Sequence, residues 1–104
     1  MYNTFLSIIT VVQHHEDVEQ VGHLLGKLYP VLKENFSDFE FIIVNNLHGR
    51  DISKKITPLE EALKHHVFQL NLSTVVNRNH AILSGLDRSN GDYTLIFEFD
   101  FNQA

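Results

Sequence analysis

The chain has 104 residues, 43% of them hydrophobic and 11% aromatic, which is the composition of one folded globular domain. No stretch approaches the roughly 20 apolar residues of a membrane span. Thirteen acidic and eight basic residues give a net charge of −5 without a basic cluster, which argues against nucleic acid as a partner. The chain lacks cysteine, and its apolar amino terminus has no basic leader, so we expect a cytoplasmic protein.

Four apolar, β-branched or aromatic segments predict strands, and the segments between them have helical periodicity. The strands are expected at 6–12, 39–44, 67–72 and 92–101. The helices are expected at 16–35, where Pro30 should loosen the last turn, at 57–65 and at 77–89. The inward residues of the last helix are expected to be Ala81, Ile82, Gly85 and Leu86. This alternation predicts a Rossmann-like α/β fold, βαβαβαβ, with a parallel sheet and helices on both faces.

Ligands of such sheets bind beyond the carboxyl ends of the strands, near the point where the strand order reverses. The segments expected at that edge are 13–15, 45–46 and 98–100. Because side chains alternate along a strand, Glu98 and Asp100 should share a face, with Cα atoms roughly 6–7 Å apart, and could hold a hard divalent cation. No Gly-x-Gly-x-x-Gly motif or P-loop follows any strand, which argues against an NAD-type dehydrogenase and a P-loop nucleotidase.

Each of these features also has a purely structural interpretation. Gly85 and Gly91 could be a helix cap and a turn residue. The asparagine pair 45–46 could serve only the local loop, and the carboxylates could discourage pairing at a sheet edge. The histidine pairs 14–15 and 65–66 are expected to be solvated surface residues rather than metal ligands, because neighbouring side chains point apart.

Several motifs, taken in chain order, resemble the family 2 glycosyltransferases with the GT-A fold. They are the strand and turn 7–16 (SIITVVQHHE), the strand and turn 40–46 (EFIIVNN), Ala81-x-x-x-Gly85-Leu86 with Gly91-Asp92-Tyr93, and Glu98-x-Asp100. The resemblance spans nearly the whole chain and implies that residues 1–104 form one domain, the nucleotide-sugar-binding amino-terminal half of that fold. It implies transfer of a sugar from a UDP- or GDP-type donor to a glycan or lipid-carrier acceptor, with Mg²⁺ or Mn²⁺ at the diphosphate.

The resemblance also implies roles for particular residues. Val12, Gln13 and His14 would lie near the base and ribose, together with Asn45, Asn46 and Glu98. An amide both donates and accepts, so Asn45 could pair with the edge of uracil. Glu98 and Asp100 would hold the metal, with Asp100 at the position of the direct ligand. No catalytic residue is assigned, because the acceptor pocket and the general base are not encoded in this segment.

Several positions depart from the family pattern. Gln13 and His14 stand where tyrosine and asparagine are usual, the asparagine pair 45–46 replaces two aspartates, and Glu98 replaces another. These departures support a second interpretation, a non-catalytic module for protein association. On either interpretation this chain alone is expected to be inactive as an enzyme. The apolar segment 93–97 is expected at an uncovered sheet edge and predicts a homo-oligomer.

Overall fold

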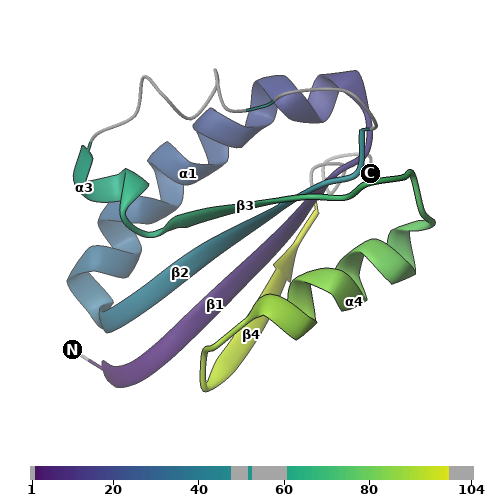
Figure 1. Cartoon of the computed structure of the whole chain (residues 1–104). Coiled ribbons are helices and arrows are strands. Elements are labelled where there is room, and N and C mark those ends of the chain that lie inside the picture. Colours follow the sequence, from purple (N-terminus) through teal and green to yellow (C-terminus); the bar gives the residue numbers. More distant parts are fainter. Residues whose placement is uncertain (1, 48–51, 53–60, 99–104) are drawn as a thin grey trace.

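The computed structural model describes residues 2–47, 52 and 61–98, which form a four-stranded parallel sheet packed against helices (Figure 1). The strands are β1 (Tyr2–Val12), β2 (Phe36–Asn45), β3 (Val67–Asn71) and β4 (Tyr93–Phe97). The helices are α1 (His15–Asn35), α3 (Glu61–Lys64) and α4 (Arg78–Arg88). The predicted Rossmann-like α/β fold with an all-parallel sheet is confirmed.

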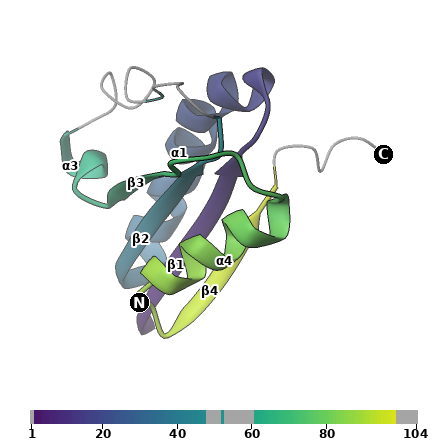
Figure 2. The same ribbon diagram turned by 45° about the vertical axis from the view of Figure 1, so that its right-hand side comes forward.

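The strand order in the sheet is β3-β2-β1-β4, so β1 and β2 are central and β3 and β4 are the edges (Figure 2). From β1 the chain adds β2 and then β3 on one side, and returns to add β4 on the other. The order therefore reverses at β1. The central position explains the continuous apolar run of β1, because both of its faces are covered.

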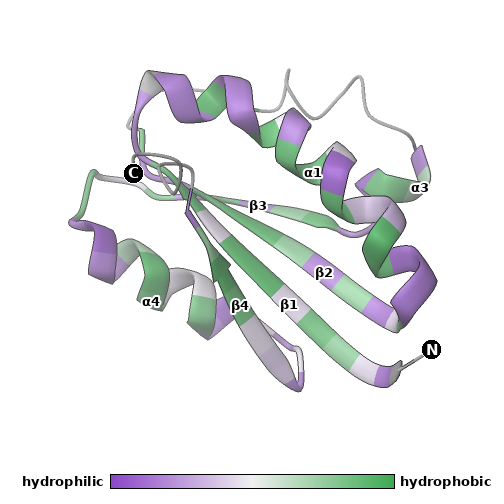
Figure 3. Cartoon of the chain, turned by 180° about the vertical axis from the view of Figure 1, so that it is seen from behind, coloured by the Kyte–Doolittle hydropathy of each residue, from purple (hydrophilic) through white to green (hydrophobic). Residues whose placement is uncertain are grey.

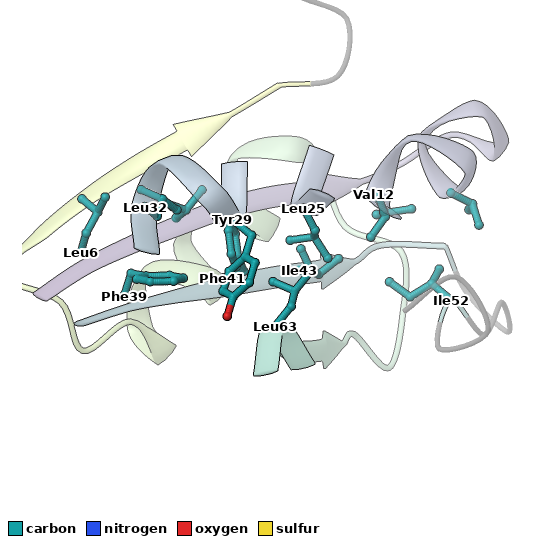
Figure 4. Packing of buried hydrophobic residues seen from close by; sticks show 13 residues of the cluster. Leu6, Val12, Leu25, Tyr29, Leu32, Phe39, Phe41, Ile43, Ile52 and Leu63 are labelled. Carbon is teal, nitrogen blue, oxygen red and sulfur yellow. The ribbon is translucent and has the colours of Figure 1, made fainter. Parts of the chain in front are cut away.

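Two apolar clusters hold the helices to the sheet, one on each face. Successive residues of β1 alternate between them, so that Ile8 packs under α1 whereas Ile9 packs under α4. Figure 4 shows the larger cluster, in which Leu25 of α1 and Leu63 of α3 pack against the strands. Figure 3 shows apolar strands between helices whose surfaces mix apolar and polar residues. Among the described helices, none is long and apolar enough to cross a membrane.

Several element boundaries differ from the sequence prediction. Strand β1 begins at Tyr2 and β2 at Phe36, earlier than expected, because their parallel pairing already begins with these two residues. Helix α1 continues through Pro30 to Asn35. Pro30 has no backbone N–H, so the carbonyl of Gly26, four residues earlier, lacks its helical donor. Both residues are exposed, so water can hydrogen-bond to that carbonyl instead. The predicted start of the helix at 57–60 and the strand residues 99–101 lie outside the described residues.

Helix α4 approaches the sheet through small residues. A Cβ atom on Gly85 would lie 2.8 Å from Cγ2 of Ile9 and 3.0 Å from Cγ2 of Val44. Gly85 is therefore a close-packing residue and not a helix cap, and the C-cap of the helix is Ser89. The prediction that Leu86 faces inward is wrong, since this side chain is 37% exposed. Leu86 lies about 100° around the helix from Gly85, on the flank of α4.

The turn from α4 to β4 is fixed by hydrogen bonds to two other strands. The backbone N–H of Gly91 donates to Oγ of Ser7 (2.8 Å), and the Ser7 hydroxyl donates to Oε2 of Glu40 (2.6 Å). The same Glu40 oxygen accepts the backbone N–H of Asn90 at 2.8 Å. A Cβ atom on Gly91 would lie 2.5 Å from the Ser7 oxygen. The expectation of a turn glycine at this position is confirmed, and the close approach is the reason.

Candidate functional site at the carboxyl edge of the sheet

The described residues of the predicted site segments lie at one edge of the sheet, at the carboxyl ends of the strands. Val12, Asn45 and Asn71 lie in register across β1, β2 and β3. Thr10 of β1 pairs with Phe97, so Glu98 follows β4 at nearly the same level. Helices α1 and α4 both begin at this edge (Figures 1 and 2). Since the strand order reverses at β1, the edge has the position at which open α/β sheets bind ligands.

The turn after β1 presents two polar side chains. The backbone N–H groups of Gln13 and His14 donate to Oδ2 of Asp17, at 2.9 and 3.0 Å, which fixes the start of α1. The His14 side chain is exposed, as expected, and that of Gln13 is half-buried. The Val12 side chain lies in the core, and its carbonyl accepts the N–H of Asn46 at 2.9 Å. This turn therefore offers a ligand the side chains of Gln13 and His14.

The side chain of Asn45 is buried and hydrogen-bonded within the chain. Its exposed fraction is 3%, its Oδ1 accepts the N–H of Leu47 (3.1 Å), and its Nδ2 donates to Oδ1 of Asn71 (3.1 Å). Oδ1 of Asn71 also accepts from Nε2 of Gln69 at 2.8 Å. These bonds tie the end of β2 to β3 and to the following loop. A nucleobase that used the amide of Asn45 would compete with them.

The side chain of Asn46 joins the end of β2 to the segment before α4. Its Nδ2 donates to the carbonyl of Val76 (2.7 Å), and its Oδ1 accepts the N–H of the same residue (3.0 Å). Asn46 is 4% exposed, so this two-bond contact is shielded from water. The contact gives Asn46 a structural role, although with a residue 30 positions away rather than within its own loop.

Glu98 forms an ion pair across the edge. Its Oε1 lies 2.7 Å from a guanidinium nitrogen of Arg78, and the two side chains are 48% and 36% exposed. Asp100, the other predicted metal ligand, lies outside the described residues. Within the part of the chain that the structure describes, no three histidine, aspartate or glutamate side chains gather in a way that could hold a metal ion. Of the predicted pair of metal ligands, the described residues thus supply only Glu98, which is bound to Arg78, and this donor set is incomplete for Mg²⁺ or Mn²⁺.

Arg78 is the residue at this edge that the sequence analysis missed. It is the first residue of α4, directly after Asn77, whose Oδ1 accepts the N–H of His80 at 2.9 Å. Helix amino ends carry partial positive charge and normally attract acidic residues. The first turn of α4 has none. A basic residue directly after an N-cap asparagine is electrostatically unfavourable for the helix. This unfavourable position is the feature of the sequence that could have identified Arg78.

The second histidine pair lies away from this edge. His65 is exposed as expected, but the prediction of a solvated side chain is wrong for His66. The His66 ring stacks on Phe39, with centroids 4.1 Å apart, and its Nδ1 lies 2.9 Å from the Phe39 carbonyl oxygen. The contact anchors the start of β3 to β2.

The edge combines hydrogen-bonding side chains beside β1 with a guanidinium group, paired with Glu98, at the start of α4. Gln13 and His14 lie on the first side, and Arg78 with the amino end of α4 lies on the second. This combination suits a ligand that carries both hydrogen-bonding groups and negative charge. The sequence matches no known protein-family description and no curated protein.

Proposed function

We propose that this chain is the donor-binding part of a glycosyltransferase that transfers a sugar from a UDP- or GDP-type nucleotide sugar to a glycan or lipid-carrier acceptor. One observation supports the proposal: the strand order reverses at β1, and the residue that follows β4 and the starts of α1 and α4 lie at the carboxyl edge of the sheet. The family resemblance of the motifs supports the same ligand class. The proposal places the protein in the cytoplasm, where such donors are found.

In this proposal different residues of the carboxyl edge bind different parts of the donor. Gln13 and His14 bind the base and ribose through their side chains, together with the backbone at Val12. The guanidinium of Arg78 and the amino end of α4 attract the diphosphate. Asn45 and Asn46 shape the wall beside the base. The resemblance adds Mg²⁺ or Mn²⁺ held by Asp100 and Glu98, where the ion would neutralise the charge of the diphosphate.

Calorimetric titration of UDP and GDP, with and without Mn²⁺, tests the proposal. We expect binding of one nucleotide that requires Mn²⁺ and that weakens by roughly tenfold or more in Asp100→Ala, because a lost charged contact costs about 1.5–3 kcal/mol. Asp87→Ala is the matched control, since Asp87 is exposed in the last turn of α4, away from the carboxyl edge. Absence of heat from either nucleotide in a sample shown to be folded by circular dichroism would refute donor binding.

A non-catalytic association module is the second candidate. It is favoured by the internal use of the predicted ligand groups, since Asn46 binds Val76 and Glu98 binds Arg78. Exposed apolar side chains on β4 favour it as well. The same titration separates the two candidates, because an association module has no reason to bind a nucleoside diphosphate in a metal-dependent way.

A further inference from the structure

The turn between α4 and β4 contains a dipeptide that is chemically unstable in proteins. Asn90 precedes Gly91, and this is the single Asn-Gly pair in the sequence. In such a pair the backbone nitrogen of the second residue can attack the side-chain amide of the first, and glycine has no Cβ atom that would hinder the attack. The Asn90 side chain is exposed, and it makes no hydrogen bond to the part of the chain that the structure describes. The amide is therefore open to this reaction.

The reaction is deamidation through a cyclic imide. The nitrogen of Gly91 loses its proton and forms a bond to Cγ of Asn90, while the bond from Cγ to the side-chain nitrogen breaks and ammonia leaves. Water then opens the imide ring at either of its two carbonyl groups. The product is aspartate or isoaspartate, and in isoaspartate the main chain runs through the former side chain. Both products replace a neutral amide by a carboxylate.

Hydrogen bonds hold the attacking nitrogen in place. The N–H of Gly91 donates to Oγ of Ser7, which is fully buried and in turn donates to Oε2 of Glu40. The N–H of Asn90 donates to the same Glu40 oxygen. The proton that must leave Gly91 is thus directed to a buried oxygen and away from hydroxide in water. We call these three hydrogen bonds the Ser7–Glu40 lock.

The lock can open without unfolding of the whole domain. Strand β4 has five residues, and among the described strands it pairs with β1 alone (Figure 2). Three of its side chains are at least 45% exposed. Short edge elements with few buried side chains open locally at a lower free energy than the core does. Each local opening releases the Gly91 nitrogen, so the rate of deamidation should follow the population of the open turn.

We propose that Asn90 is a deamidation site whose rate is set by the Ser7–Glu40 lock, and that the modification weakens the attachment of β4 to β1. The new carboxylate adds negative charge next to Asp92, in a turn whose backbone is already bound to the carboxylate of Glu40. Isoaspartate also lengthens the main chain by a methylene group directly before Gly91, where a Cβ atom would already lie 2.5 Å from the Ser7 oxygen. Since ammonia is lost, modified molecules accumulate with age. The inference does not depend on either candidate function, because the turn lies at the opposite end of β4 from the carboxyl edge.

Peptide mass spectrometry measures the rate of the reaction. Trypsin cleaves after Arg88 and releases a peptide that begins at Ser89, and the fragment masses of this peptide locate the change at Asn90. The folded chain should deamidate at least roughly tenfold more slowly than the chain kept unfolded in guanidinium chloride at the same pH, because only open molecules react. Equal rates in the folded and unfolded chains would overturn the proposal.

Ser7→Ala tests the lock, because it removes the acceptor of the Gly91 N–H. We expect deamidation at Asn90 to become roughly threefold to tenfold faster, as the loss of one hydrogen bond implies. Asn46→Ala is the matched control, since it also removes hydrogen bonds of a buried side chain, but at the carboxyl edge of the sheet. Equal acceleration in both variants would show that Gly91 reacts only when the whole domain unfolds. A slower reaction in Ser7→Ala would show that Ser7 removes the proton as a catalyst, and either result would overturn the proposal.

Hydrogen exchange tests the effect of the modification on β4. Ion exchange isolates the deamidated chain, because it carries additional negative charge. The amides of 93–97 should lose protection by roughly threefold or more relative to the unmodified chain, whereas those of β2 should keep theirs. Asn79→Asp places the same charge on the exposed surface of α4 and should leave β4 unchanged. Unchanged protection of β4 in the deamidated chain, or an equal loss in Asn79→Asp, would overturn the proposed weakening.

Discussion

Replacing Gly85 by alanine adds one methyl group where α4 meets the sheet. Two opposing effects determine the result. Alanine is the better helix former by roughly 0.5–1 kcal/mol in a helix interior. The new Cβ atom, however, would lie 2.8 Å from Cγ2 of Ile9 and 3.0 Å from Cγ2 of Val44, and both of those side chains are fully buried. Overpacking of this kind costs about 1–3 kcal/mol, so the steric term should prevail.

The same substitution at Gly26 provides a matched control. Gly26 lies inside α1 and is exposed, and a Cβ atom there would have no heavy atom within 4 Å. Only the helix-propensity term remains, so Gly26→Ala should stabilise the fold by about 0.5–1 kcal/mol. Gly85→Ala should destabilise it by about 1 kcal/mol. The two chemically identical changes should therefore shift stability in opposite directions.

Urea unfolding followed by circular dichroism measures both changes as free energies. The slope of the unfolding free energy against urea should stay constant, because neither variant alters the area exposed on unfolding. A difference of 1 kcal/mol corresponds to about 4–8 °C in melting temperature for a domain of this size. If Gly85→Ala were as stable as the parent chain or more stable, the close contact between α4 and β1 would not be the reason for the glycine.

Two further predictions concern polar contacts. Asn46→Ala removes both hydrogen bonds to Val76 and should cost about 2–4 kcal/mol in thermal or urea unfolding, whereas Asn79→Ala on the exposed surface of α4 should stay within about 0.5 kcal/mol; a cost no larger than that of the control would contradict the structural role of Asn46. The hydrogen bond from Lys64, and then its charge, hold the pKa of Glu61 below its ordinary value. Because the pKa is lower in the folded state, the stabilising effect is present above the ordinary glutamate pKa and is lost as the pH falls through the folded pKa. Lys64→Met should raise the pKa of Glu61 toward its ordinary value in an NMR titration, and an unchanged pKa would show that Lys64 is not the cause.

The sequence predicted the sheet because its signals there were strong and local. The continuous apolar run of a buried strand ends at Val12, and the spacing of a helix begins directly after it. Few folds accommodate such an alternation of strands and helices. Boundaries were less predictable. The pairing of Tyr2 with Phe36 extends both strands beyond their most apolar parts, and it depends on a contact that no local window contains.

The candidate site was predictable in position but not in detail. Gln13, His14 and Glu98 lie at the expected edge, because parallel strands bring their carboxyl ends together. The hydrogen bonds and ion pairs at this edge could not be predicted from the sequence. Asn46 binds a residue 30 positions away, and Arg78 binds Glu98 across the gap between α4 and β4. The prediction that Leu86 faces inward was wrong because Gly85 is the residue of α4 that contacts the sheet closely, so the residue after it lies on the flank of the helix.

The turn that Ser7 fixes has a consequence for the order in which the protein is built. Its hydrogen bond to Gly91 joins residues 84 positions apart, and β1 gains its second neighbour only when β4 arrives. During synthesis β1 is made early, so one side of the most apolar strand stays uncovered while the rest of the sheet is still being translated. Non-local closures of this kind slow folding and expose nascent chains to aggregation. The fold therefore makes its central strand depend on the segment that leaves the ribosome after all of the other described strands.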